Sequence, residues 1–565
     1  MAIQDVIRES PRVLINTTSG RLCSKSEQAA VFESLPVFMQ LISSMTTYID
    51  HTQIQQAVTE YYRYAAFSHK WEENEPLFEK VLHIVVYDLE ESPTHDKLQM
   101  FCTIVRDAGF HWAWSDTCCI NKADHFVLQE ALVAMFKWYE GSALTIIFLR
   151  GVHSPSQRGD LVKSIWNSRA WTFQEYHASK VVRFYTEDWT PYLNLNIPNH
   201  KVSPEIISEM EEAAGLPARA LMALRPGLDD IREKLCLASR RETTLVEDAA
   251  YSLLGMFSIS LPVVYGEGDQ ALGRLLAQLL TSAGDTSILA WTGRSGSFNS
   301  CLPAHIAVFN QWSDTHIPPA IRGTQMNMTT TRLQASSIDL TLAMTLYDRL
   351  NELPVAFFTG QRIKLPCITF KLGPLSATRS SSGYVFRAQT AALGVMEIET
   401  EENLSRLDSL YLIHPWIDFL LDRQPVGSVT ETIPQESSSS GHRYSLIAVP
   451  ASDGPSHATS VVPRTRAARL VARLGRPFSG RFSIQDAASL RPPSSVSQAD
   501  KQLRALQVLA RLRQPFGALL LTPNHGHVAA YRRVASESLI TVKMEGITPT
   551  VLNKLVDNVR ILDLL

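Results

Sequence analysis

Polar side chains that could bind a small ligand follow two predicted strands of this 565-residue chain. The apolar runs Tyr64–Ser68 and His111–Ser115 are rich in strand-forming residues. Ser68 and His69 lie where the first run ends, and Asp116 directly follows the second. Open α/β sheets bind ligands beyond the carboxyl ends of their strands. These three side chains therefore either face a ligand or form the turns and caps that also occur there.

A tryptophan and a glutamate, Trp171 and Glu175, have the i, i+4 spacing that places both on one face of a helix. The Glu175 carboxylate could hold a sugar hydroxyl or stabilise an oxocarbenium-like centre during glycosidic cleavage. Alternatively, it is an ordinary surface acid or the ion-pair partner of Arg169 or Arg183. Trp71 and Trp171 could stack on the ring of a ligand, or they pack in the core.

Two adjacent cysteines, Cys118 and Cys119, raise the question of thiol or metal chemistry. A thiol nucleophile would need a nearby histidine such as His69 or His125, but no spacing in the sequence supports it, and buried cysteines are common. Together with His111 and His125 the cysteines match no zinc spacing, so we predict no metal site. The chain also lacks the G-x-x-x-x-G-K-[ST] stretch of P-loop proteins.

Two more apolar runs, Leu144–Leu149 and Val181–Tyr185, complete a set of four predicted strands. Segments with helical spacing of apolar residues separate these strands. Strands that alternate with helices predict an α/β domain, with a mostly parallel sheet flanked by helices. The strands of such a sheet end at one edge, where Trp171 and Glu175 would join the other candidate residues.

Composition and charge describe an ordinary globular protein, with 45% hydrophobic and 19% charged residues. The net charge of −3 gives no electrostatic case for a nucleic-acid partner. Seven cysteines without paired C-x-x-C spacing favour reduced thiols. The N-terminus lacks the basic start and apolar core of a signal peptide, and no apolar run reaches the length of a membrane span. We therefore expect a cytoplasmic protein with no membrane span.

Changes of pattern along the chain predict its organisation. Helical periodicity dominates from 201 to 285, with a capping box at Thr244–Glu247. From 286 onward, short alternating runs such as Ile338–Met344 indicate β-structure. Arginines between 464 and 481 form a solvated arm, or they bind an acidic partner or a membrane surface. The predicted segments are an α/β domain at 1–200, a helical extension at 201–285, a β-rich domain at 286–429, a linker at 430–441, and a part at 442–565 that contains the low-complexity Ser/Pro/Arg segment 452–500 and completes the β-rich domain.

Three stretches in order resemble the HET (heterokaryon incompatibility) domain of fungal proteins. They are YAAFSHKW at Tyr64–Trp71, WAWSDTCCINK at Trp112–Lys122 and SRAWTFQE at Ser168–Glu175. Two residues depart from the family's pattern, since Glu72 and Ala170 stand where the family has glycine. A changed backbone requirement at either position could alter the loop that shapes the site.

The resemblance implies a role in non-self recognition, in which a HET-type domain triggers programmed cell death when incompatible hyphae fuse. The HET fold has been thought similar to TIR domains, some of which cleave NAD with a glutamate in a comparable Ser-x-x-Trp-Cys-x-x-Glu stretch. Here Thr172 stands at the cysteine position. The resemblance implies NAD or a related nucleotide as a substrate, and no cofactor. The predicted site consists of Glu175 as the catalytic residue and Ser68, His69, Trp71, Asp116 and Trp171 as substrate-binding residues.

A function of a different class also agrees with the sequence. The chain would then be a non-catalytic interaction or scaffold protein, whose β-rich C-terminal region recognises a partner. In either case the expected partner is an unknown protein or a second copy of this chain.

Overall fold

The computed structural model describes residues 2–44, 51–310, 339–379, 383–390, 392–407, 409–415, 498–513, 516–524, 530–544 and 546–565. Nearly all of them belong to one compact unit, Met1–Arg423 with Gln502–Leu565. The predicted linker 430–441 and the arginine-rich segment 464–481 lie outside the described residues, as does nearly all of the low-complexity segment. The predicted domain boundaries therefore stay predictions.

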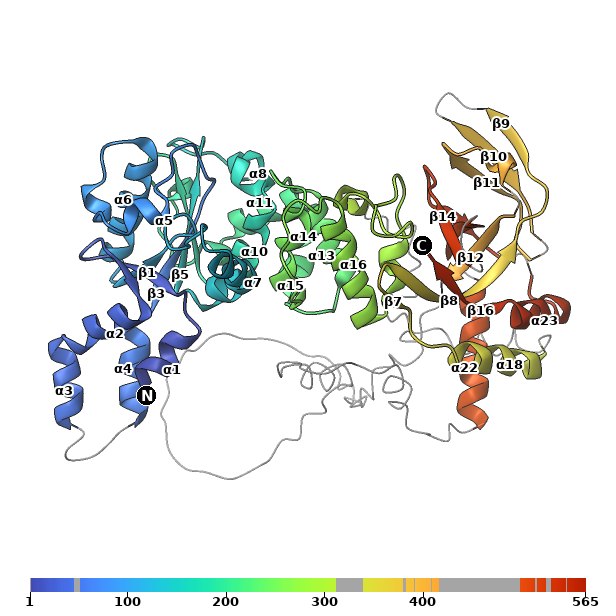
Figure 1. Ribbon diagram of the computed structural model, residues 1–565, viewed down its shortest axis with the longest axis horizontal. Helices are drawn as coiled ribbons and strands as arrows, with labels where there is room; N and C mark the ends of the chain where they lie inside the picture. The colour runs from blue at the N-terminus through green and yellow to red at the C-terminus, as the bar shows by residue number, and fades with distance from the viewer. Residues whose placement is uncertain are drawn as a thin grey trace, which may run out of the picture. The chain divides into compact units, whose positions relative to one another are not determined.

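A six-stranded sheet in the order β2-β1-β4-β3-β5-β6 forms the centre of the N-terminal part (Figure 1). β3 to β6 are mutually parallel, so the four predicted strands do share one mainly parallel sheet. β1 and β2 add an antiparallel edge. The bounds are β1 (Val13–Asn16), β2 (Leu22–Ser24), β3 (Tyr64–Ser68), β4 (Trp112–Trp114), β5 (Leu144–Leu149) and β6 (Val182–Thr186).

The order of the parallel strands defines where a ligand would bind. Numbered along the chain, these strands lie in the order 2-1-3-4, which places the topological switch point between β3 and β5. Ligands of doubly wound sheets bind at the carboxyl ends of the strands beside this point. Ser68 is the last residue of β3, and Asp116 follows β4 by two residues. The fold thus places both predicted residues at the edge where ligands collect.

Helices cover both faces of this sheet. α6 (Pro93–Asp107) begins at the Ser92 cap, and α7 (His125–Gly141) begins at the Asp124 cap. Right-handed crossovers place α6 on one face and α7 and α10 (Trp171–Ala178) on the other, as Figure 1 shows. The remaining helices of this part are α1 (Ala2–Arg8), α2 (Lys25–Glu33), α3 (Pro36–Ser44), α4 (His51–Tyr61), α5 (Phe78–Val81), α8 (Asp160–Lys163) and α9 (Ile165–Ser168).

Residues 204–283 are mainly helical, but the predicted capping box is wrong. The helix there begins at Asp248 rather than after Thr244. The Glu247 carboxylate instead accepts hydrogen bonds from the backbone N–H groups of Gly266 and Gly268, at 2.8 and 2.9 Å. These two N–H groups, about twenty residues further along the chain, take the place of the local helix-capping donors. The helices are α11 (Pro204–Ala214), α12 (Ala218–Ala223), α13 (Ile231–Ser239), α14 (Asp248–Tyr251), α15 (Leu254–Phe257) and α16 (Gln270–Ala283).

The C-terminal part is rich in β-structure, as predicted. Five of its strands close into a ring, because β12 pairs with β13 and β8, and β16 pairs with β14 and β8. Closure leaves these strands without a free edge along their paired residues. The bounds are β7 (Phe357–Thr359), β8 (Arg362–Lys371), β9 (Ser376–Arg379), β10 (Tyr384–Ala388), β11 (Met396–Thr400), β12 (Tyr411–Pro415), β13 (Phe516–Pro523), β14 (Ala530–Val534), β15 (Ile540–Val542) and β16 (Val559–Leu564).

One predicted strand of this part is a helix instead. Residues 340–344 of the run Ile338–Met344 belong to α18 (Leu340–Asn351), which Asp339 caps by accepting from the N–H groups of Thr341 and Leu342. Leu346 and Leu350 continue the buried face at helical spacing, which the short alternating run concealed. The other described helices here are α22 (Gln498–Leu512) and α23 (Pro549–Asp557). Within the described residues, no helix has the length and apolar character needed to cross a bilayer.

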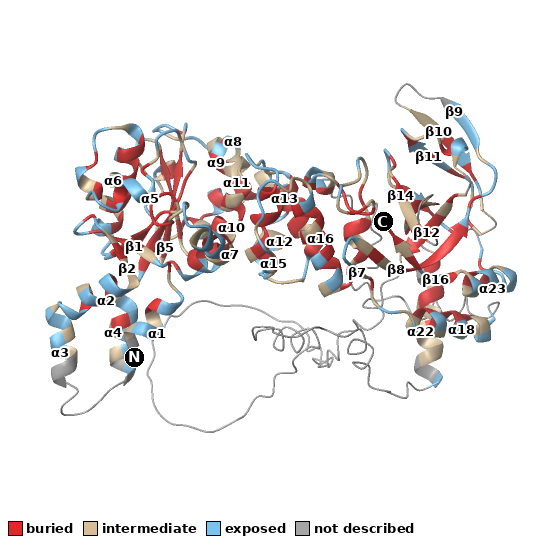
Figure 2. Cartoon of the chain, viewed as in Figure 1, coloured by how far each residue is buried: buried red, intermediate tan, exposed pale blue. Residues whose placement is uncertain are grey.

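Figure 2 shows the strands at the centre of the N-terminal part as buried. Helical spacing predicts Met135 and Trp138 as core residues of α7, and both are buried. The Trp138 ring packs edge-on against Trp114 of β4, with 5.6 Å between centroids. Trp138→Ala is expected to lower the free energy of unfolding by about 3 kcal/mol, the lower end for a buried tryptophan because 6% of its surface stays exposed. Urea unfolding measures this loss. Phe126→Ala on the exposed face of α7 is the control, and a Trp138 variant as stable as the parent would contradict the assignment.

Candidate functional site

A buried hydrogen-bond chain joins the end of β3 to α9 and α10. The Ser68 hydroxyl donates to Glu175 Oε2 and accepts from the indole N–H of Trp166 at 2.7 Å. Ser68 is 0% exposed and Glu175 is 4% exposed. Nearby, the Tyr139 hydroxyl donates to the Phe67 carbonyl oxygen at 2.8 Å. Two residues predicted to form one site, 107 positions apart, are therefore in direct contact.

The surroundings of the Glu175 carboxyl group bring its pKa close to neutral pH, so the protonated and ionised forms are both populated there. Its pKa is raised to about 7, first by burial and then by the neighbouring Asp116 carboxylate. The positive charges of Arg169 and Arg241 and the Ser68 hydroxyl act in the opposite direction. A carboxyl group with a pKa near the working pH can act either as an acid or as a base, which is a property of catalytic glutamates.

The raised pKa of Glu175 predicts a measurable dependence of stability on pH. The folded state holds the proton more tightly than a chain with the ordinary value of 4.5. Protonation therefore stabilises the fold fully below pH 4.5, and this contribution is lost as pH rises through 7. The difference corresponds to about 3 kcal/mol. Relative to Glu175→Gln, the wild type is expected to lose this amount between pH 4.5 and pH 8 in urea unfolding. Parallel stability curves would contradict the shifted pKa.

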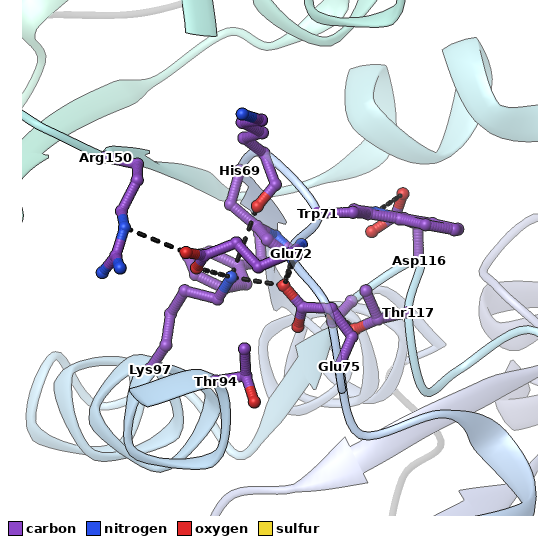
Figure 3. Close-up of polar contacts among 12 residues, drawn as sticks. His69, Trp71, Glu72, Glu75, Thr94, Lys97, Asp116, Thr117 and Arg150 are labelled. Atoms are coloured by element: carbon purple, nitrogen blue, oxygen red, sulfur yellow. Dashed lines mark hydrogen bonds and ion pairs between the residues drawn. The ribbon is translucent and has the colours of Figure 1, made fainter. Parts of the chain in front are cut away.

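Trp71 and Asp116 form the open part of the same edge (Figure 3). The Trp71 indole N–H donates to Asp116 Oδ2 at 2.9 Å, and 37% of the Trp71 surface is exposed. The Lys122 ammonium group lies 3.4 Å from the centroid of the Trp71 ring. These contacts hold an aromatic ring at the protein surface beside a carboxylate. A planar ligand could stack on this ring only where Lys122 leaves a face free.

Next to this edge, a lysine is buried among carboxylates (Figure 3). Lys97 of α6 lies 2.9 Å from Glu72 Oε2 and forms a second ion pair with Glu75, although its side chain is only 2% exposed. Arg150, which follows β5, lies 2.9 Å from Glu72 Oε1 and also pairs with Glu187. This charged cluster links the loop after β3 to α6 and to the end of β5.

Two of the predicted site residues are placed away from the open edge. His69 is buried, its ring stacks on Phe67 at 4.2 Å between centroids, and its Nε2 lies 3.6 Å from Glu75 Oε1. Burial lowers the pKa of His69. Trp171 is partly buried against the core. The ring beside Asp116 is therefore Trp71 and not Trp171.

The two departures from glycine have no backbone consequence. Ala170 has φ −66° and ψ −43°, which any residue adopts, and Glu72 is not among the described residues with positive φ. Glu72 instead contributes its carboxylate to the ion pairs with Lys97 and Arg150.

Arg169 and Arg183 are the alternative ion-pair partners that the sequence suggests for Glu175. Neither of them forms a direct ion pair with it. Arg169 donates to the His69 carbonyl oxygen at 2.6 Å, and Arg183 donates to that of Pro198 at 3.3 Å. Cys118 and Cys119 are buried, and burial raises the pKa of the Cys119 thiol well above its usual value. A buried thiol that resists ionisation is a poor nucleophile.

Sequence reasoning missed the residues that hold this site in place. Lys97 carried a usable signal, because it shares an i, i+4, i+8 stripe of α6 with Phe101 and Val105, and a lysine in an apolar stripe needs a buried partner. Trp166 and Tyr139 gave no comparable signal. Their contacts with β3 depend on how α7 and α9 pack against the sheet.

Comparison with known proteins agrees with the first two motifs, Tyr64–Trp71 and Trp112–Lys122, which lie within the matched residues. Residues 64–159 match the family model described as Heterokaryon incompatibility protein (HET). The chain carries a HET domain. It is also 32% identical over 227 residues to Vegetative incompatibility protein HET-E-1 of Podospora anserina. That match covers 38% of this chain and 16% of the relative, so this chain corresponds to a small part of that protein's length. No solved structure matches the chain significantly.

Proposed function

We propose that this chain acts in heterokaryon incompatibility, and that its HET domain cleaves NAD or a related nucleotide to trigger cell death. The observation that carries the proposal is the Glu175 carboxyl group, hydrogen-bonded to Ser68 beside the switch point of the sheet, with a pKa raised to about 7. In this role Glu175 stabilises the positive charge that develops on the ribose as the bond to nicotinamide breaks. Trp71 and Asp116 at the open edge bind the substrate.

The reaction requires a change at the site. Ser68 and Glu175 are closed to solvent, because α9 and α10 pack over the end of β3. We propose that self-association, or binding of a protein partner, moves α10 enough to admit the nucleotide. Activity would then depend on protein concentration or on the partner, which keeps the domain silent in an unfused cell.

Incubation of the purified chain with NAD tests this function directly. Chromatography would follow the release of nicotinamide at several protein concentrations and in the presence of a crowding agent. Release that rises more steeply than protein concentration supports both cleavage and activation by association. An extract of a fungal host that the chain kills supplies any protein partner. If the chain releases no nicotinamide under these conditions or in that extract, NAD cleavage is excluded.

A non-catalytic function is favoured by one specific observation. The hydrogen bonds that link Glu175, Ser68 and Trp166 are buried and join β3 to two helices. Their role could be purely structural, which is to fix α9 and α10 on the sheet. The domain would then be a docking module, and the β-rich C-terminal part would recognise the partner. In that case killing should survive any substitution at Glu175 that preserves folding.

A further inference from the structure

A cavity lies beside α10, and the residues of the Ser68–Glu175 contact do not line it. It has a volume of about 600 Å³, and residues from α9, α10, α11, α12 and α13 line it. Asn199, which accepts the backbone N–H of Val182 at 3.0 Å, also lines it, so the cavity reaches the amino end of β6. Neither Ser68, Asp116 nor Glu175 lines this cavity. It is therefore distinct from the proposed catalytic edge.

Positive charge dominates the cavity lining. Six cationic side chains face a single carboxylate, that of Glu212, which leaves an excess of five positive charges. None of the six makes an ion pair with a carboxylate among the described residues. The six cations are Lys163, Lys180, Lys201, Arg225, Arg240 and Arg241.

Three of these cations are held in place by the protein backbone. Arg225 donates to the carbonyl oxygens of Met222 and Leu224, at 2.6 and 2.8 Å. Lys201 donates to the carbonyl oxygens of Tyr176 and Ser179, at 2.7 and 2.6 Å. Arg241 donates to the carbonyl oxygen of Arg169 at 3.1 Å. Burial lowers the pKa of Lys201 to about 8 and that of Arg241 to about 10. Such desolvated charges gain more from an anionic ligand than charges that remain in water.

The wall formed by α10 is aromatic. Phe173 and His177 lie 4.6 Å apart between ring centroids, and Tyr176 lies 5.4 Å from His177. The guanidinium of Arg241 lies 5.4 Å from the Phe173 ring, and the Lys201 ammonium lies 4.5 Å from that of Tyr176. The cavity thus combines rings that can contact a planar group with fixed cations around them.

We propose that this cavity binds a nucleoside di- or triphosphate, with the phosphates against the cations and the base against the aromatic wall. A volume of about 600 Å³ lies in the usual range for small-molecule sites. A single carboxylate, as in a fatty acid, would leave most of the cationic excess unbalanced. A chain of two or three phosphates carries the charge that the lining lacks. Binding here needs no turnover, so it is separate from the proposed cleavage of NAD.

Calorimetric titration of the purified full-length chain tests the proposal, with ATP, ADP and inorganic triphosphate as probes and EDTA present. ATP and ADP are expected to bind, more weakly as salt is raised. ATP should bind at least about tenfold more tightly than inorganic triphosphate, which has a comparable charge and no base. Failure of the folded chain to bind ATP and ADP would overturn the proposal. Equal affinity for triphosphate would overturn the assignment to a nucleotide.

Charge variants locate the bound probe. Lys180 and Arg240 are exposed, so Lys180→Glu and Arg240→Ala should preserve folding, which circular dichroism checks. Lys180→Glu is expected to weaken ATP binding by about tenfold or more, and Arg240→Ala by somewhat less. Arg219→Glu makes the same change of charge on α12 outside the cavity and is the matched control. An equal effect of the control, or no effect of both cavity variants, would place ATP elsewhere and overturn the proposal.

Discussion

Glu175→Gln is expected to reduce nicotinamide release at least about a hundredfold and to abolish killing in a fungal host. Glutamine keeps the length and hydrogen-bonding reach of the side chain, but it cannot carry the negative charge that stabilises a ribosyl cation. The substitution therefore separates chemistry from folding. Because Glu175 is buried with a pKa of about 7, its neutral replacement should be at least as stable as the wild type above pH 7.

The control for this experiment is Glu140→Gln, which removes an exposed carboxylate at the end of α7. It should leave stability, nicotinamide release and killing unchanged. A folded, stably expressed Glu175→Gln protein that still kills would end the catalytic interpretation. The docking function would then explain why Glu175, Ser68 and Trp166 are joined inside the domain.

Lys97→Ala is expected to lower the free energy of unfolding by about 5 kcal/mol at pH 7. Removing one partner of a buried ion pair usually costs 3–5 kcal/mol, and here Glu72 and Glu75 both lose the same cation. Burial of Glu75 opposes its ionisation, yet His69 and Lys97 outweigh that effect and lower its pKa to about 2. Because this value lies below the ordinary 4.5, the stabilisation is full above pH 4.5 and is lost as pH falls towards 2.

Urea unfolding at pH 7 and at pH 3 measures both parts of this prediction. Lys137→Ala on the exposed face of α7 is the control and should change stability little. The double variant Lys97→Ala with Glu75→Gln should recover part of the loss, because it leaves one fewer buried charge without a partner. A Lys97→Ala protein within about 1 kcal/mol of the parent would show that water replaces the lysine at no cost.

The sequence determined the parallel part of the central sheet because each of its four parallel strands has a local signal. Tyr64–Ser68 and Leu144–Leu149 are continuous apolar runs, and the structure forms strands with these bounds. The same patterning placed Ser68 and Asp116 at one edge, since strand direction alone fixes where parallel strands end. Local signals failed where the decisive partner is distant in the chain, as with Glu247, whose carboxylate binds Gly266 and Gly268 rather than capping a helix.

Only the tertiary structure decided what the predicted side chains contact. Ser68 and Glu175 meet because α10 packs over the end of β3, and this packing also closes them to solvent. Trp71 and Trp171 are indistinguishable by residue type, yet one lies exposed beside Asp116 and the other packs against the core. Burial and charge from several elements together set the pKa of Glu175. Strand positions follow from the local sequence, whereas contacts and pKa values depend on side chains that only folding brings together.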